Sequence, residues 1–254
     1  MCKPVYTLQG WYKNAETFNL IGFLRALKKP VHLDKIWEKW QQAADKAAFA
    51  IELKELIKPE ISYYDDNYLG LNYGSPNTRN LLLLLNLATL LNKPGEKTRF
   101  SFSNFHRFNW DIEHISPQNP KSIEVFLADV DADSLPDELK DWNQADDKKR
   151  HELIDKYTTS TPNVLQNLTL LTAHDNRGIG NKHFFEKREV LKRYLKEGSF
   201  IPHCSINVFV KFYTVNPVNL NYWDLDKDGQ GYLKYIEDTI EKFFKPETRN
   251  DQLQ

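Results

Sequence analysis

The chain has 254 residues, of which 34 are Lys or Arg and 35 are Asp or Glu, so its formal net charge at pH 7 is −1. This near-neutral total gives no sign of a bulk attraction to nucleic acid or to a membrane surface. The two cysteines, Cys2 and Cys204, are too few for a four-thiolate zinc site, so no zinc is expected. They are expected to be reduced thiols in a cytoplasmic protein.

Residues 1–97 are predicted to form a helical N-terminal region. Apolar side chains recur at helical spacing, as at Phe18, Ile21 and Leu24. The longest apolar run, residues 81–91, contains polar residues and is well short of the roughly 20 residues that cross a bilayer. It predicts a buried helix, and no membrane partner is expected.

The pattern changes near residue 98. Residues 99–103 alternate between polar and apolar, and residues 108–115 are aromatic and β-branched, which together predict a strand pair or hairpin. A further strand is predicted at residues 167–172. Helices are predicted at residues 181–196 and 222–244, the last of them within a helical C-terminal region, 201–254.

Charge is distributed unevenly along this second part of the chain. Residues 121–150 carry nine acidic and five basic side chains, which indicates an acidic, mostly solvated helical insertion at about 121–160. Residues 177–197 carry seven basic and three acidic side chains. The near-zero net charge therefore conceals a local basic face, although a solvated amphipathic helix explains such a face equally well.

Two short segments carry residues suited to chemistry. In residues 110–118 (Trp-Asp-Ile-Glu-His-Ile-Ser-Pro-Gln), Glu113 stands directly before His114 on a predicted strand, and Asp111 shares the strand face of Glu113. In the second segment, Asn167 and Asn176 stand nine residues apart, separated by a short apolar strand. Each asparagine also has a purely structural interpretation: Asn167 as a residue that stabilises a loop through its side-chain amide, and Asn176 as a helix N-cap.

Together these segments resemble the HNH nucleases of the His-Me finger superfamily. The matching elements are residues 113–117 (Glu-His-Ile-Ser-Pro), residues 167–171 (Asn-Leu-Thr-Leu-Leu) and Asn176. The sequence pattern is most similar to that of the DUF1524 family, which forms the C-terminal part of GmrSD-type restriction enzymes. The resemblance implies a mainly helical α+β protein, with a ββα-metal nuclease core at residues 98–200 between helical flanks.

The resemblance also implies roles for individual residues. His114 is expected to be the general base, since an imidazole with a pKa near roughly 6.5 accepts a proton at neutral pH. Asn167 is expected to tie the following loop to the strand and to fix the His114 ring. Mg²⁺, or Mn²⁺, is the expected cofactor; Glu113 and Asn176 are the expected ligands, with Asp111 as a secondary candidate. The residues expected to hold the DNA backbone are Arg177, Asn181, Lys182 and Lys187.

The function that follows is metal-dependent hydrolysis of double-stranded DNA in an antiphage or modified-DNA restriction system. Enzymes of this type carry a DUF262, ParB-like sensor domain for which this chain is too short, so a partner in trans, or a longer parent protein, is expected. Two alternatives stay open. One is a non-catalytic helical subunit that docks on a DUF262-type partner, and the other is an HNH nuclease that acts on RNA.

Another segment begins like a calcium-binding EF-hand loop, with aspartates at 224, 226 and 228 followed by Gly229. The twelfth position of such a loop needs a bidentate Glu, and here it is Tyr235. The segment is therefore interpreted as a turn that leads into the last helix.

Overall fold

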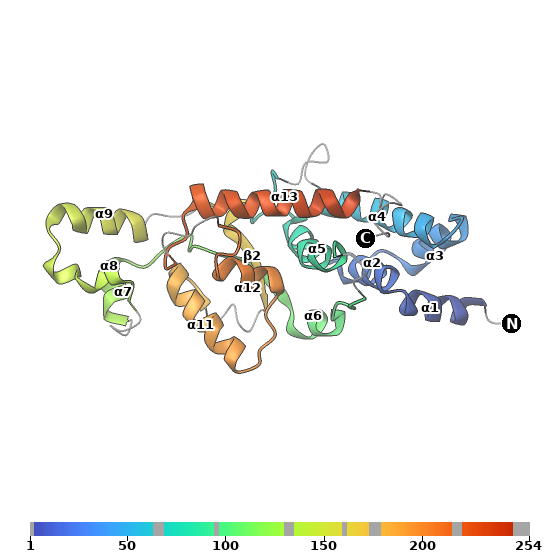
Figure 1. The fold of residues 1–254 in the computed structure, drawn as a ribbon, viewed down its shortest axis with the longest axis horizontal. Coiled ribbons are helices and arrows are strands. Elements are labelled where there is room, and N and C mark those ends of the chain that lie inside the picture. Colours follow the sequence, from blue (N-terminus) through green and yellow to red (C-terminus); the bar gives the residue numbers. More distant parts are fainter. Residues whose placement is uncertain are drawn as a thin grey trace. The chain divides into compact units, whose positions relative to one another are not determined.

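The computed structural model describes residues 3–62, 69–93, 97–129, 135–158, 162–172, 179–214 and 220–245 (Figure 1). The chain divides into two compact units. Residues 1–71, 75–109 and 235–254 form the first unit, and residues 72–74 and 110–234 form the second. Residues 98–109 thus belong to the first unit, and the last helix, α13 (Gln230–Phe244), has residues in both units.

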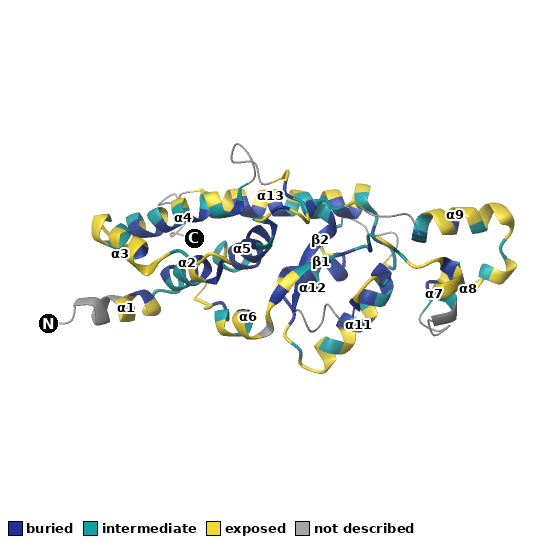
Figure 2. Cartoon of the chain, turned by 180° about the vertical axis from the view of Figure 1, so that it is seen from behind, coloured by how far each residue is buried: buried dark blue, intermediate teal, exposed yellow. Residues whose placement is uncertain are grey.

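The first unit is helical, as predicted, and consists of α1 (Lys3–Lys13), α2 (Ala15–Ala26), α3 (Leu33–Gln42), α4 (Lys46–Ile61), α5 (Thr78–Leu91), α6 (Phe102–Phe108) and the C-terminal part of α13. Its core lies where α2, α4 and α5 contact one another. Their buried residues include Leu20, Phe23, Leu24, Phe49, Leu53, Ile57 and the five leucines at 81–85. Buried stretches of the chain are dark blue in Figure 2. The leucine run of α5 is thus a buried helix rather than a surface one.

Side-chain caps fix where two of these helices begin. The Asn14 carboxamide oxygen accepts a hydrogen bond from the Thr17 amide at 2.8 Å at the start of α2. The Asp45 carboxylate does the same for the Ala48 amide at 2.8 Å at the start of α4. Each cap satisfies an amide that the helix itself leaves without a partner.

The alternating segment at residues 99–103 is not a strand, so the predicted hairpin is wrong. The buried side chain of Asn19 in α2 donates to the Thr98 carbonyl oxygen at 2.9 Å and accepts from the Phe100 amide at 2.8 Å. It thereby occupies backbone groups that a neighbouring strand would need. The chain then enters α6, so the alternation reflects contacts with a helix.

The second unit is centred on two antiparallel strands, β1 (Trp110–His114) and β2 (Leu168–Thr172). Their register places Glu113 opposite Thr169 and His114 opposite Leu168. Strand β2 is buried along its whole length, as Figure 2 shows, and α12 (His203–Phe209) packs against it. Both strands were predicted, but each finds its partner more than 50 residues away along the chain.

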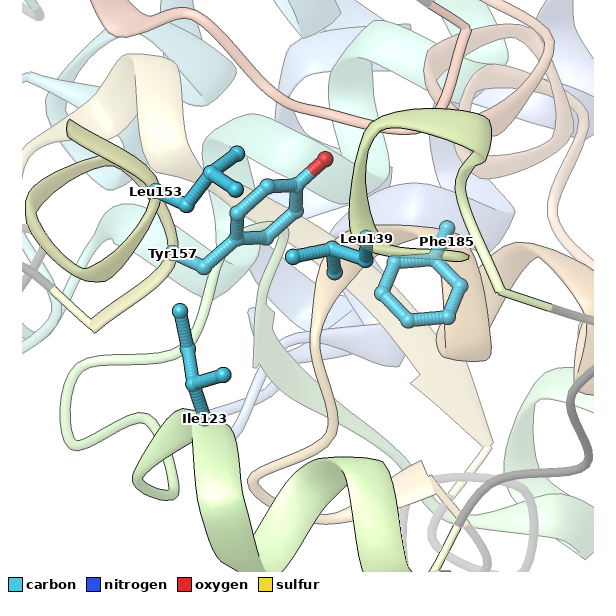
Figure 3. Close-up of a cluster of buried hydrophobic side chains, with 5 residues drawn as sticks. All are labelled: Ile123, Leu139, Leu153, Tyr157 and Phe185. Carbon is cyan, nitrogen blue, oxygen red and sulfur yellow. The ribbon is translucent and has the colours of Figure 1, made fainter. Parts of the chain in front are cut away.

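The remaining elements of the second unit are α7 (Ile123–Asp129), α8 (Asp137–Lys140), η3 (Trp142–Gln144), α9 (Asp147–Thr158), η4 (Leu165–Asn167), α11 (Phe184–Lys196) and the π-helical turn η5 (Leu225–Gly229). The described residues of the acidic insertion include the helices α7, α8 and α9, and they contribute to a small apolar core. This cluster, shown in Figure 3, consists of Ile123, Leu139, Leu153, Tyr157 and Phe185. Since Phe185 belongs to α11, the insertion packs against the helix that carries Lys187.

The described residues therefore form a mainly helical α+β protein with a two-stranded sheet, which confirms the coarser part of the predicted fold class, mainly helical α+β. Within these residues, no helix combines the length and the apolar character needed to cross a membrane.

Two helical glycines are predicted to respond in opposite directions to the same substitution. A Cβ at Gly22 in α2 would meet the Phe102 ring, whereas a Cβ at Gly10 in α1 would meet nothing within 4 Å. Gly22→Ala is therefore expected to lower the free energy of unfolding by about 1–3 kcal/mol, since the ring must shift. Gly10→Ala should raise it by up to about 1 kcal/mol, because alanine loses less backbone entropy in a helix. Urea denaturation followed by circular dichroism measures both, and equal effects at the two sites would contradict this packing.

Candidate functional site

A buried ion pair joins the end of β1 to α11. The Lys187 ammonium lies 2.5 Å from Glu113 Oε1 and 2.6 Å from the His114 carbonyl oxygen. Lys187 is 0% exposed and Glu113 is 7% exposed. One ammonium therefore holds both the Glu113 carboxylate and the backbone of the next residue.

Burial acts on both members of this pair. It raises the pKa of Glu113 and lowers the pKa of Lys187, since it disfavours each charge. The attraction and hydrogen bond between the two side chains oppose both pKa shifts. The charge of each group therefore depends on the presence of the other.

His114 ends strand β1, and its ring is held from two directions. Its Nε2 lies 2.6 Å from Asn163 Oδ1, and the Tyr73 ring stacks on it with 4.7 Å between ring centroids. A carboxamide oxygen only accepts, so this contact favours the tautomer with the proton on Nε2, which leaves Nδ1 as the basic nitrogen of the ring. Burial, together with the Lys187 charge, lowers the pKa of His114 despite the opposing hydrogen bond to Asn163. The imidazole is therefore neutral at neutral pH.

Asn167 braces the loop that follows β1. Its Oδ1 accepts from the Ser116 amide at 2.8 Å and its Nδ2 donates to the Ser116 carbonyl oxygen at 3.0 Å. Its own carbonyl oxygen accepts from the Ile115 amide at 2.8 Å. The expected tie between loop and strand is present, but the expected contact with the His114 ring is made by Asn163 instead.

A pocket of about 320 Å³ opens beside these residues. Its lining consists of Tyr73, Ile112, Glu113, His114, Gln118, Gly180, Asn181 and Lys187. Among the described residues, Glu113 Oε2 receives no hydrogen bond, whereas Oε1 is held by Lys187. The pocket thus brings together a neutral imidazole and a carboxylate with one uncommitted oxygen.

The other expected site residues lie in different places. Asp111 is exposed, its Oδ1 accepts from the Ile112 amide at 2.8 Å, and it does not line the pocket. Lys182 is partly exposed, and its Nζ lies 4.0 Å from Glu186 Oε1. Lys187, expected at the DNA surface, is instead wholly buried, because its ammonium pairs with Glu113. Asn176 and Arg177 lie outside the described residues.

Two residues of this site were not singled out from the sequence. Tyr73 stands in a segment that the sequence marks only as a loop, and Asn163 belongs to no recognisable motif. Both contact His114 from distant positions in the chain. No local signal in the sequence points to either contact.

Hydrogen bonds to the Asp228 carboxylate stabilise the aspartate-rich turn at residues 224–229. The Asp228 carboxylate accepts from the Lys211 ammonium at 2.5 Å, from Thr214 Oγ1 at 2.6 Å and from the Asp224 amide at 2.8 Å. Asp228 is 2% exposed. Its oxygens are thus used inside the protein, in agreement with the interpretation of this segment as a turn.

The family model of GmrSD restriction endonucleases, C-terminal domain, matches residues 58–242. This span is more than half of the chain and contains both strands, α11 and every site residue named above, so the chain belongs to this family of restriction endonucleases. No curated protein and no solved structure matches the chain.

We predict that Lys187→Met lowers the free energy of unfolding by about 3–5 kcal/mol, because it leaves the Glu113 carboxylate buried without its partner. The double variant Glu113→Gln, Lys187→Met should recover part of this loss, since no charge then remains to be buried. Urea denaturation at pH 7 measures both. The matched control is Lys192→Met, which removes an exposed pair with Glu189 in the same helix and should change stability by less than about 1 kcal/mol. Equal losses for the two single variants would contradict the importance of the buried pair.

His183 predicts a pH dependence of stability. It precedes α11 and is 3% exposed, and burial, with the Lys187 charge as a lesser cause, lowers its pKa to about 4. Below pH 6.5 the His183 imidazole becomes protonated in the unfolded chain, whereas in the folded chain it stays neutral until the pH approaches 4. The free energy of unfolding therefore falls as the pH drops from 6.5 towards 4.

The variant His183→Asn keeps a residue suited to a helix N-cap and removes this titration. From pH 7 to pH 5 it should lose about 2 kcal/mol less unfolding free energy than the wild type. Urea denaturation at the two pH values measures the difference. His203→Asn, at an exposed histidine of the same unit, is the control, and an equal pH dependence in wild type and His183→Asn would refute the prediction.

Proposed function

We propose that the chain is a metal-dependent HNH endonuclease that hydrolyses DNA phosphodiester bonds in defence against foreign or modified DNA. The observation that carries the proposal is the geometry of His114. Its ring is neutral, its Nε2 proton is bound by Asn163, and it lines a pocket together with the Glu113 carboxylate. Membership of a restriction endonuclease family supports the substrate class.

His114 acts as the general base in this proposal. With Nε2 protonated, Nδ1 accepts a proton from a water molecule as that water attacks phosphorus. The bond from phosphorus to the 3′ oxygen breaks, and the 3′ oxygen leaves with the bonding electron pair and takes a proton from a solvent water. The resulting imidazolium is stabilised by its hydrogen bond from Nε2–H to Asn163 Oδ1. Asn167 acts at a distance from the reaction, because it fixes the loop that follows the base.

Glu113 and Asn176 are the proposed ligands of one Mg²⁺ or Mn²⁺ ion. When bound, the ion supplies Lewis-acid stabilisation of the charge that develops on the phosphate and on the leaving oxygen. The residues present fit such an ion, since Glu113 Oε2 is uncommitted and the pocket has room for water ligands. Within the described part of the chain, no group of three or more His, Cys, Asp and Glu side chains is placed to hold a metal, so this ion would depend on few protein ligands.

The exposed basic side chains around α11 are the proposed contacts to the DNA backbone. Asn181 lines the pocket, and Lys182, Lys192, Arg193 and Lys196 are at least partly exposed. Arg177 joins them by its position in the sequence, whereas Lys187 acts inside the site. A DUF262-type partner is proposed to supply the sensing of the modified base.

We predict that the full chain nicks or cuts plasmid DNA with Mg²⁺ or Mn²⁺, alone or with its cognate DUF262-type partner, and that EDTA abolishes the cut. His114→Ala should lower the rate at least about 100-fold, since no other group replaces the base. Asn176→Ala should weaken cleavage and shift its metal dependence to higher Mg²⁺ concentration. Agarose gels of supercoiled, nicked and linear plasmid measure the rates.

The matched control is His106→Ala, at an exposed histidine of α6 that lies outside the pocket. Cleavage by His114→Ala at the wild-type rate would refute the proposed function. Cleavage of a matched RNA but not of the DNA would refute the proposed substrate. The absence of any cut with DNA, RNA, metal and partner together would favour a non-catalytic docking subunit.

A further inference from the structure

A short segment from the N-terminal part of the chain is built into the unit that contains the site. Residues Asn72–Gly74 form the 72–74 strap, which belongs to the second unit. Asn72 pairs with Val164 in an isolated antiparallel bridge, and the Tyr73 amide donates to the Asn163 carbonyl oxygen at 3.1 Å. The Gly74 amide donates to Asn72 Oδ1 at 2.9 Å, which closes the turn of the strap on itself.

The strap and Asn163 meet at one ring. Asn163 binds the strap through its backbone and His114 through its side chain, with 2.6 Å between Oδ1 and Nε2. Tyr73, held by the same backbone bond, stacks on the His114 ring with planes 24° apart. The imidazole is therefore fixed in its plane by an aromatic face and at one edge by an acceptor.

The partial exposure of Tyr73 indicates that burial in the core does not determine the position of its side chain. Its side chain is 47% exposed, yet it lies against the imidazole and lines the pocket. A tyrosine that served only the core would be covered more completely. Among the described residues its hydroxyl has no hydrogen-bond partner, so the ring contact with His114 is its specific interaction.

We propose that Tyr73 and Asn163 are positioning residues that together clamp the general base. Asn163 selects the tautomer with the proton on Nε2, and Tyr73 keeps the ring in the plane that presents Nδ1 to the attacking water. This inference rests on the proposed function for its effect on catalysis. The clamp itself is a property of the folded chain and is testable without any cleavage.

The first test reads the tautomer of His114 by NMR of the full chain with ¹⁵N-labelled histidine. The His114→Ala variant assigns the ring signals. In the wild type at a pH where the ring is neutral, Nε2 should carry the proton and Nδ1 should not. Asn163→Ala should shift the ring signals towards a mixture of tautomers, while Asn163→Asp, which keeps the acceptor, should retain the Nε2–H form. A wild-type ring protonated on Nδ1, or unchanged signals in Asn163→Ala, overturns the clamp.

The second test measures the rate of DNA cleavage under the conditions in which the wild type cuts. Asn163→Ala should lower kcat about 10- to 100-fold with little change in KM, since it disorders the base and not the DNA contacts. Tyr73→Leu should lower kcat about 10-fold. Rescue is expected in Tyr73→Phe, which restores the ring, and in Asn163→Asp. Tyr12→Leu and Asn143→Ala, at exposed positions far from the site in sequence, are the matched controls.

The two tests separate the clamp from the proposed function. If His114→Ala cuts DNA as well as the wild type, the nuclease assignment fails, and the NMR result still decides whether the clamp exists. If His114→Ala is inactive but Asn163→Ala and Tyr73→Leu cut at the wild-type rate, His114 remains the base and the positioning role is refuted. Variants whose circular dichroism departs from the wild type are replaced by Asn163→Ser and Tyr73→His, for which the same comparison of kcat applies.

Discussion

The site depends on one buried contact, the ion pair between Lys187 and Glu113. Taking both charges out of water costs several kcal/mol each, and this cost is offset by the attraction between the two charges together with the hydrogen bond from the ammonium to the His114 carbonyl oxygen. That second bond fixes the end of β1 against α11. Asn167 then fixes the loop that begins one residue later. The strand end that carries the candidate base is thus held from both sides, by a charge and by an amide.

The sequence predicted the parts of this arrangement that are local. The leucine run of α5 and the apolar run of β2 are continuous enough to identify a buried helix and a buried strand, and residues 113–117 are distinctive as a motif. The predictions that failed concern residues whose structure is determined by tertiary contacts. Residues 99–103 alternate like a strand, but Asn19 takes up their backbone hydrogen bonds, and Lys187 sits in a basic stretch although its charge faces inward. The roles of Tyr73 and Asn163 could not be predicted from the sequence, since a tyrosine and an asparagine in loops contact His114 only once the chain has folded.

The near-neutral net charge also has a structural explanation. The acidic insertion is not a loose polar segment, because Phe185 of α11 completes its small apolar core. Acidic and basic residues thus belong to packed neighbouring elements of the same unit. Because Lys187 is buried, the basic face of α11 is smaller than the composition of the helix indicates. Any contact with the DNA backbone would rely on the exposed lysines and arginines of this helix.

The ion pair also constrains how the proposed metal would bind. Glu113 is one carboxylate that already balances the charge of Lys187, so a divalent ion at Oε2 would meet a nearly neutral pair and not a free anion. Mg²⁺ is commonly held by one or two carboxylates together with substrate phosphates. Among the described residues few side chains are placed to bind such an ion, so under the proposed function the DNA phosphate would be its main source of negative charge. Under the proposed function, metal and DNA would therefore bind together, and the free protein would hold a positioned base without the phosphate that the activated water attacks.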